Sequence, residues 1–432
     1  MKILIAILIL SLLIFVHEFG HFVVAKICGV HVKEFSLGMG PRLLKFKRKD
    51  TLYSIKLFLF GGSCAMSGMD ENGDETGEGS YLSKSVWKRM AIIVAGPLFN
   101  IILAFLFSVI LIGKVGYDPC VVGAVADNSP AYEAGLKPGD KIVKINKKNI
   151  TFYEDYALYE MEHDGETMEI TYVRDGEKYK TTVIPRYVDE NVYQIGVMLN
   201  TDNADNKLEV SDVTDDMPAS EAGIKKGDVL LSVNGEKIKD YQHFRSMLLR
   251  YGEYNIRIMV DRGGSQVMVK LKPDRVHQSY YTTGMGFANV WEKVSPIKTI
   301  GYSFKYTGYW SKSVFASIKM LINKKASIND VSGPVGIVNI VGNVVEETKD
   351  EGALIVLLNL LNFSIMISAN LGIMNLLPIP ALDGGKLFFL IIEAVRRKPV
   401  PREKEGIVHF VGVILLFLLT LAILFNDIRK LF

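Results

Sequence analysis

Four long runs of apolar residues stand out along the chain, at residues 3–24, 90–112, 353–376 and 407–425. As a helix, each run is long enough to cross the hydrocarbon core of a bilayer, which needs about 20 apolar residues. The first run has no cleavage motif typical of a signal peptide, so we expect it to be retained. The pattern predicts a polytopic α-helical membrane protein with four transmembrane helices.

Between the first two runs, residues 32–37 and 52–58 have the composition of β-strands, and glycine-rich turns at 38–41 and 61–62 break them. We expect β-hairpins on the cytosolic side of the membrane. One hairpin edge is able to pair with an extended substrate as an added strand. A hairpin that only packs is the alternative. The acidic, glycine-rich residues 70–79 predict a mobile surface loop.

An internal repeat lies between the second and third runs. Residues 128–136 return as 216–224, and residues 138–146 return as 226–234, at one ungapped offset of 88 residues. Such a long period fits two tandem small domains rather than a solenoid. The order of strand, short Pro-Ala helix, Gly-Asp turn, strand, helix and hairpin resembles a PDZ domain of bacterial proteases. Peptide binding by strand addition and purely steric exclusion both remain open as roles.

Charge and cysteine content narrow the function classes. The formal net charge is only +3, so a nucleic-acid partner is not indicated. Three cysteines lie far apart without a CxxC pair, which argues against a cysteine-ligated zinc site or a disulfide framework. Eleven Lys and Arg residues fall within 26–89 and six within 386–404. These loops should face the cytosol, which places both termini and the repeat on the extracytoplasmic side.

The first apolar run contains the sequence HEFGH at residues 17–21. On a helix, His17 and His21 are one turn apart and share a face, so both can bind one ion. Glu18 lies beside the first ligand, where it can act as a general base toward water. This is the pattern of an HExxH zinc site. Ionisable groups at such membrane depth are functional by default, although a chance match on an anchoring helix is the alternative.

A catalytic zinc site usually has three protein ligands, and HExxH provides two. The third candidate is Asp383, within NLLPIPALDGG at residues 375–385. Two prolines one residue apart cannot continue a helix, and the glycine pair gives a backbone that is free to bend. The third span should therefore unwind there, near the depth of His17. Asn375 offers its amide to a substrate backbone or oxyanion. The alternative for Asp383 is the N-cap of a helix over residues 386–396.

Two further features are less specific. His409 lies just inside the fourth span, where we expect a packed, hydrogen-bonded histidine rather than a metal ligand. Residues 302–323 are aromatic and basic with helical spacing of apolar groups. We expect this segment to lie in the membrane interface.

Short motifs spread over the chain point to one family: HEFGH at 17–21, AGPLFN at 95–100, SGPVG at 332–336 and LDGG at 382–385. Together they resemble the site-2 protease family of intramembrane zinc metalloproteases, most closely its bacterial RseP-type group, here with two PDZ domains. By that resemblance, His17, His21 and Asp383 bind Zn²⁺, Glu18 is the general base and Asn375 positions the substrate.

The resemblance also implies a function and a setting. Family members hydrolyse peptide bonds in or near transmembrane segments of membrane proteins, in regulated intramembrane proteolysis. The implied partners are the lipid bilayer and single-span membrane proteins already trimmed by another protease, such as anti-sigma factors, with signal-peptide remnants as a further class. The implied location is the bacterial inner membrane, as a multi-pass protein. The alternative is a catalytically silent PDZ scaffold that binds client helices, for which Glu18 would have no use.

We expect these segments in chain order: the first transmembrane helix with HExxH (1–25), the hairpin region with the acidic loop (26–88), the second transmembrane helix (89–113), PDZ domain 1 (114–188), PDZ domain 2 (189–276), interfacial amphipathic helices (277–352), the third transmembrane helix with its unwound end (353–385), a cytosolic loop (386–406) and the fourth transmembrane helix (407–426).

Overall fold

The computed structural model describes residues 2–69, 77–200, 207–327 and 331–429. Within this part of the chain, four helices are long and apolar enough to cross a membrane, as expected. These helices are α1 (Lys2–Ile27), α2 (Val86–Val115), α9 (Ala353–Leu376) and α11 (Arg402–Arg429). The predicted loop at 70–79 lies largely outside the described residues.

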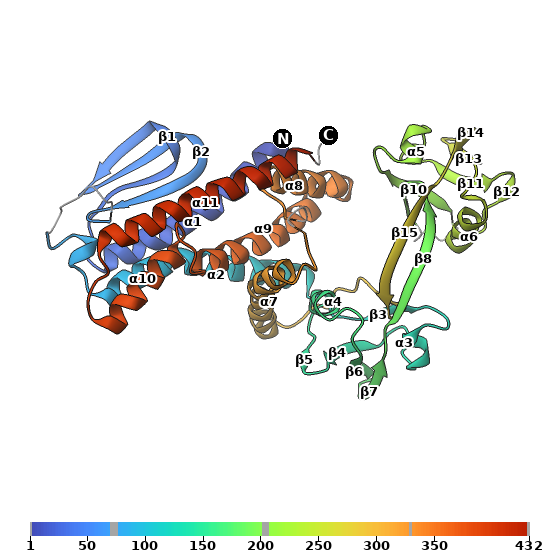
Figure 1. Cartoon of the computed structure of the whole chain (residues 1–432), viewed down its shortest axis with the longest axis horizontal. Helices are drawn as coiled ribbons and strands as arrows, with labels where there is room; N and C mark the ends of the chain where they lie inside the picture. Colours follow the sequence, from blue (N-terminus) through green and yellow to red (C-terminus); the bar gives the residue numbers. More distant parts are fainter. Residues whose placement is uncertain (1, 70–76, 201–206, 328–330, 430–432) are drawn as a thin grey trace.

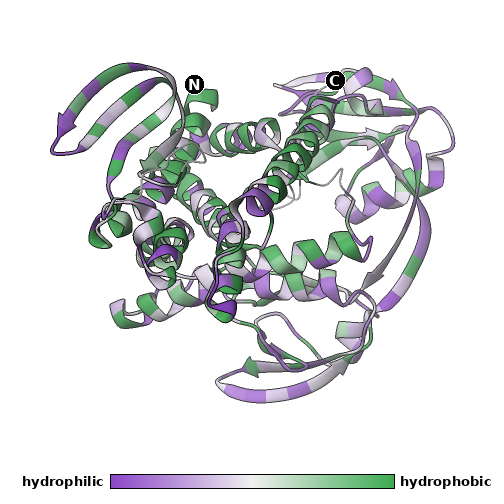
Figure 2. Ribbon diagram, turned by 60° about the vertical axis from the view of Figure 1, so that its left-hand side comes forward, coloured by the Kyte–Doolittle hydropathy of each residue, from purple (hydrophilic) through white to green (hydrophobic). Residues whose placement is uncertain are grey.

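The helices form a layer between two β-rich parts. Figure 1 shows the sheet of strands β1 (Val32–Arg48) and β2 (Thr51–Met66) at one end of this layer and the repeat region at the other. Figure 2 shows that the long helices carry mostly hydrophobic residues, whereas the outer strands are mixed or hydrophilic. Helix α2 is central, and it contributes buried residues along most of its length.

Strands β1 and β2 pair mainly antiparallel, and they curl so that one segment of β1 has two partners in β2. Residues 34–37 of β1 pair antiparallel with 62–65 of β2 and in parallel register with 52–55. The expected breaks at the glycine turns are only partly observed, because both strands continue through them with register shifts. Arg42 binds Glu34 with two hydrogen bonds of 2.8 and 2.9 Å across the curl. The Arg42 guanidinium is the main cause that lowers the pKa of Glu34 to about 2.

The repeat found in the sequence recurs in the structure at the same offset. We define repeat unit 1 as residues 120–183 and repeat unit 2 as residues 208–271. The elements of unit 1 are β3 (Val122–Val125), α3 (Pro130–Glu133), β4 (Lys141–Ile145), β5 (Lys148–Asn149), α4 (Tyr153–Glu162), β6 (Met168–Arg174) and β7 (Glu177–Val183). Those of unit 2 are β10 (Leu208–Val213), α5 (Pro218–Glu221), β11 (Val229–Val233), β12 (Glu236–Lys237), α6 (Tyr241–Tyr251), β13 (Ile256–Arg262) and β14 (Ser265–Leu271). Each unit has its own hydrophobic core.

The two units exchange strands. Strand β9 (Val197–Asn200), which follows unit 1, pairs with β10 of unit 2. Strand β16 (Met285–Phe287), which follows unit 2, pairs with β3 of unit 1. The linking strands β8 (Arg186–Gln194) and β15 (Asp274–Thr282) pair antiparallel with each other along their full length. The units are therefore interleaved, and residues 277–287 complete this region rather than opening the interfacial helices as we expected.

The same ion pair closes both units. In unit 1, Arg174 donates to both carboxylate oxygens of Asp140, at 2.6 and 2.7 Å. In unit 2, Arg262 donates to both oxygens of Asp228, at 2.7 Å each. Both aspartates are fully buried. The Gly-Asp turn of the repeat thus provides a buried anchor for the arginine at the end of the following hairpin strand.

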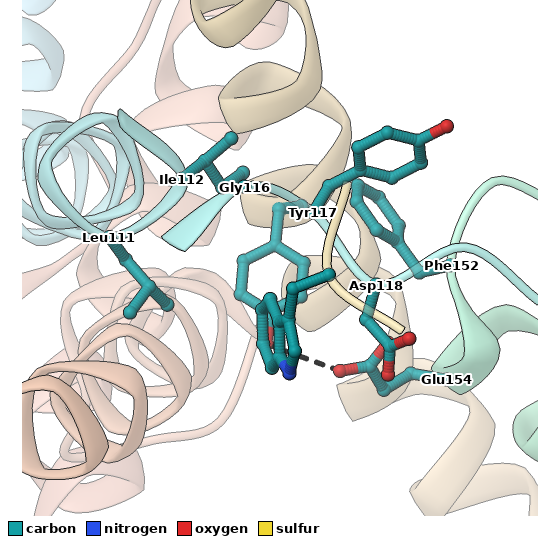
Figure 3. Close-up of a pocket in the computed structure, with 9 residues that line it drawn as sticks. Leu111, Ile112, Gly116, Tyr117, Asp118, Phe152 and Glu154 are labelled. Atoms are coloured by element: carbon teal, nitrogen blue, oxygen red, sulfur yellow. Dashed lines mark hydrogen bonds between the residues drawn. The ribbon is translucent and has the colours of Figure 1, made fainter. Parts of the chain in front are cut away.

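An aromatic junction connects unit 1 to the membrane helices. Phe152, at the start of α4, lies 5.1 Å from Tyr306 of α7 (Pro296–Ile322), measured between ring centroids. The Tyr306 hydroxyl donates to Asn362 of α9 at 2.8 Å. Beside these rings, Asp118 and Glu154 line a small cavity, and Figure 3 shows their carboxylates close together. The junction fixes α4 against α7 of the helical layer.

Helix α7 has three distinct faces. Its buried face includes Ser303 and Thr307 and packs against α2 and α9. A second face is apolar and exposed, with Phe304 72% exposed. Lysines on a third face recur every seven residues, at positions 298, 305, 312 and 319. This arrangement is typical of a helix that lies at the boundary between lipid chains and headgroups.

Helix α11 lies at the edge of the layer. Only 6% of its most apolar window is buried. Near its C-terminal end, the buried carboxylate of Asp427 accepts hydrogen bonds from the backbone N–H groups of Gly333 and Gly336, at 3.2 and 2.8 Å. These N–H groups begin helix α8 (Pro334–Thr348), so Asp427 caps that helix from a distant element. The SGPVG motif therefore forms a docking point for α11.

Candidate metal centre

Three side chains from distant parts of the chain meet in the helical layer. His17 and His21 lie on α1, and Asp383 begins α10 (Asp383–Arg396), just after the chain leaves α9. His17 and His21 are 8% and 6% exposed. Their nitrogens and an Asp383 carboxylate oxygen all lie within 4.8 Å of one another. The structure thus brings together the three residues that the sequence analysis named as ligands.

The distances within this group suit a small divalent cation. Oδ2 of Asp383 lies 3.0 Å from Nε2 of His17 and 3.2 Å from Nε2 of His21. The two Nε2 atoms are 3.2 Å apart. In a tetrahedral zinc site with bonds of about 2.0–2.1 Å, ligand atoms are separated by roughly 3.3 Å. The donor set and its spacing therefore fit Zn²⁺.

The environment of His21 leaves Nε2 as its ligand atom. Nδ1 of His21 lies 2.8 Å from the backbone carbonyl of Ile92 on α2 and donates its proton there. Nε2 then carries the lone pair and faces the other two groups. Gly96 makes room for this ring, because a Cβ at that position would lie 2.3 Å from Nε2 of His21.

His17 has a polar neighbour on helix α2, the helix that also carries Ile92. Nδ1 of His17 lies 3.4 Å from the side-chain amide of Asn100, which is fully buried. Oδ1 of Asn100 accepts no hydrogen bond within the described part of the chain. Turning the amide by 180° places Oδ1 opposite Nδ1 of His17, so that the Nδ1–H tautomer donates to it. Asn100 then orients His17 with Nε2 as ligand atom.

Glu18 lies next to strand β2. A Cβ at Gly62 would lie 3.3 Å from Cγ of Glu18 and 3.1 Å from the Ser36 carbonyl, so the absence of a side chain allows the strand to approach. Glu18 follows directly after His17 on α1 and is half-buried. Glu18 is therefore the neighbour in sequence of one candidate ligand, and its side chain lies against the Gly62 segment of the sheet.

The break after α9 brings Asp383 back toward α1. Helix α9 ends at Leu376, and α10 begins at Asp383, as the paired prolines predict. The N-cap residue of α10 is Leu382, so Asp383 is not the N-cap considered as its alternative role. The Asp383 side chain is 16% exposed and turns toward the histidines.

The other predicted residues take different positions. Asn375 lies half-buried in the last turn of α9, and its contact with substrate stays a prediction. Nδ1 of His409 accepts the Ala381 N–H at 3.0 Å, so His409 is a packed, hydrogen-bonded residue as expected. The sequence pattern alone indicates no individual role for Asn100 or for the Ile92 carbonyl. The signal for Asn100 was a polar residue inside an apolar run.

A membrane-embedded cluster of two histidines and an aspartate, with a glutamate beside it, defines an intramembrane metallopeptidase as the class of protein. The model of peptidase family M50 matches residues 5–419. The chain belongs to this family and is a zinc metalloprotease of the site-2 type.

Named relatives cover nearly the whole chain. The regulator of sigma-W protease RasP of Bacillus subtilis is 31% identical over 99% of this chain and 98% of its own. The zinc metalloprotease RasP of Geobacillus kaustophilus is 29% identical over 99% of this chain and 97% of its own. The regulator of sigma-E protease RseP of Salmonella typhimurium is 31% identical over 98% of each chain. Among solved structures, the HtrA3 PDZ domain bound to a phage-derived ligand is 20% identical, covers 21% of this chain and 93% of its own, and has a TM-score of 0.18.

Proposed function

We propose that His17, His21 and Asp383 hold one Zn²⁺ and that Glu18 is the general base of an intramembrane peptidase. The observation that carries this assignment is the convergence of two nitrogens and one carboxylate oxygen at 3.0–3.2 Å. Held by these residues, the ion would supply Lewis-acid chemistry, the polarisation of a carbonyl and a lower pKa of water.

The chain's own residues do the rest of the chemistry. Glu18 takes a proton from the attacking water and then gives it to the leaving amine. The Asn375 amide hydrogen-bonds to the substrate backbone near the scissile bond. Asn100 and the Ile92 carbonyl hold the two imidazoles in the tautomer that ligates through Nε2.

The substrate is a transmembrane segment that has to unwind, because a helix uses its carbonyls internally. Residues 62–65 form an edge of the β1–β2 sheet, and Gly62 lies beside Glu18. We infer that the unwound segment adds to this edge as a strand and is held extended across the site. The sheet thereby links recognition of an extended chain to the general base.

The repeat units filter partners on the opposite side of the membrane. We infer that both units are PDZ domains and that they lie extracytoplasmically with both termini, in the inner membrane of a bacterium. The basic loops near β1–β2 and α10 support this orientation, and α7 lies in the outer interface. Interleaved units above the helices exclude clients with bulky outer domains, so clients are single-span proteins already trimmed by another protease. The names of the RasP and RseP relatives favour regulators of sigma factors as clients.

A membrane-anchored reporter in native membranes tests the general base. Glu18→Gln should lower cleavage about 10²–10⁴-fold while zinc content stays at the wild-type level. Glu403→Gln, an exposed position at the start of α11, is the matched control and should cleave as wild type. Equal cleavage by Glu18→Gln and wild type would favour the silent scaffold. Adding a folded outer domain to the reporter should slow cleavage, and an unchanged rate would contradict the filter.

A further inference from the structure

A tight turn lies directly before Asp383. The Leu382 N–H donates to the Ile379 carbonyl at 3.2 Å, which closes a four-residue β-turn. Pro380 occupies its second position, and Ala381 occupies its third with φ of +77°. This is the arrangement of a type II turn, whose third position favours glycine or asparagine because φ is positive. An alanine there is strained and needs support from its surroundings.

His409 of α11 provides that support. The Ala381 N–H is not used inside the turn, and it donates to Nδ1 of His409 at 3.0 Å. The His409 side chain is 16% exposed, and its ring lies 5.7 Å from the Phe389 ring of α10. Because Nδ1 accepts this hydrogen bond, Nε2 carries the hydrogen of the neutral imidazole, and Nε2 faces Glu405 at 3.9 Å. The ring is therefore held between α10, α11 and the turn.

Helix α11 touches the turn at a second point one helical turn further on. A Cβ at Gly412 would lie 2.3 Å from Cβ of Pro380, so only glycine permits this approach. His409 and Gly412 are three residues apart and share the face of α11 that meets the turn. The close approach is local, because α11 is otherwise one of the least buried helices.

We propose that His409 is a positioning residue for the third metal ligand. Ala381 precedes Asp383 by two residues, so a rotation of this strained peptide moves the Asp383 carboxylate relative to His17. The hydrogen bond from Ala381 to His409 holds the turn in the conformation that presents Oδ2 to the histidines. This role rests on the proposed function, in which Asp383 binds zinc. The position of α11 then affects where the Asp383 carboxylate lies relative to the histidines, although α11 contributes no ligand.

The zinc-loaded, full-length protein in detergent tests this role through the rate at which a chelator removes zinc. His409→Ala should release zinc about 10–100-fold faster, as for loss of other partners that orient metal ligands. His409→Asn keeps an acceptor near the Nδ1 position and should restore most of the wild-type rate. Thr420→Ala, at an exposed position further along α11, is the matched control and should behave as wild type. Thermal midpoints are measured for each variant.

The decisive variant is Ala381→Gly in the His409→Ala background. Glycine adopts a positive φ without strain, so the double variant should return to within about threefold of the wild-type release rate. If His409 only stabilised the packing of α11, Ala381→Gly would not restore the rate of zinc release. Wild-type release by His409→Ala, or no rescue in the double variant, overturns the proposal. Asp383→Asn separates the two assumptions: zinc retained by that variant refutes the ligand assignment itself, whereas zinc lost there with no effect of His409→Ala refutes only the positioning role.

Discussion

Oδ2 of Asp383 lies 3.0 Å from Nε2 of His17, although 366 positions separate the two residues in the chain. Neither α1, which carries His17, nor α10, which begins at Asp383, forms the site alone. Helix α1 presents both histidines on one face, and the unwound end of α9 returns the aspartate to that face. Helix α2 packs between them and provides Asn100 and the Ile92 carbonyl behind the imidazoles. The distances between the ligand atoms therefore depend directly on how these three elements pack.

Replacement of Asn100 tests whether α2 orients His17. Asn100→Leu is similar in size but leaves Nδ1–H of His17 without an acceptor, so we expect zinc affinity to fall about 10–100-fold. Asn100→Asp keeps an acceptor oxygen and should lose less. Competition with a zinc-binding dye measures the affinity.

The control for this replacement is Ser368→Ala. The Ser368 hydroxyl donates to the backbone carbonyl of Asn100 at 2.8 Å and is equally buried, but within the described part of the chain it forms no hydrogen bond with His17. It should cost about 1 kcal/mol of stability without changing zinc affinity. If Asn100→Leu binds zinc as tightly as wild type, Asn100 does not orient the ligand.

The paired aspartates of the repeat predict a symmetric effect on stability. Asp140→Asn and Asp228→Asn each remove the charge of a buried aspartate that binds a partly exposed arginine, and each should destabilise its own unit by about 2–3 kcal/mol. Hydrogen exchange of the full-length protein reads β4 and β6 separately from β11 and β13. The exposed Asp212→Asn is the control. Destabilisation of both units by one substitution would show that the exchanged strands couple them.

This stability has a defined pH dependence in unit 2. Hydrogen bonding to Arg262 lowers the pKa of Asp228 below its ordinary value of 3.8. A lowered pKa in the folded state stabilises the protein above the unfolded value, and the contribution is lost as pH falls through the folded value. The difference between wild type and Asp228→Asn should therefore be constant near neutral pH and shrink below about pH 4. A constant difference down to pH 2 would contradict the ion pair.

The junction between unit 1 and the helices has the opposite pH dependence. Burial raises the pKa of Glu154 to about 7 and that of Asp118 to about 6. Figure 3 shows the two carboxylates beside the aromatic rings of the junction. The folded state then binds protons more tightly than the unfolded state. Stability of the junction is greatest below the ordinary carboxyl pKa and falls as pH rises toward 7.

Hydrogen exchange in α4 measures this dependence in the full-length protein. Exchange should accelerate between about pH 5 and pH 7 beyond the intrinsic change in rate. Glu154→Gln should remove most of the acceleration, because an amide does not titrate in this range. Glu166→Gln, at an exposed position after α4, should leave it unchanged. Identical profiles for Glu154→Gln and wild type would exclude Glu154 as the titrating group.

The helices and the histidine pair follow from local patterns. Runs of about 20 apolar residues define the spans, and a spacing of four residues places His17 and His21 on one helix face. Asp383 was predictable because a proline pair ends α9 before it. Each of these inferences needs only residues that are close in the sequence.

The features that could not be predicted from the sequence are contacts between elements that are distant in the chain. Strands β9 and β16 are both short and apolar. Nothing in their sequences indicates that β9 pairs with β10 of unit 2 and that β16 pairs with β3 of unit 1. The bond from His21 to Ile92 uses a backbone carbonyl, which every residue has. One signal was available: Arg174 and Arg262 occupy the same position of the repeat, and so do the aspartates that they bind. A charge pair repeated at one offset is a reason to expect contact.

X-ray absorption at the zinc edge of the purified full-length protein tests the central claim most directly. We predict one zinc per chain, bound by two imidazole nitrogens and by oxygen at about 2.0–2.2 Å, with no sulfur in the shell. Asp383→Asn should change this shell or lose the metal, whereas His31→Ala, at an exposed histidine outside the helical layer, should not. A sulfur ligand, or an unaltered shell and full zinc content in Asp383→Asn, would contradict a centre built from His17, His21 and Asp383.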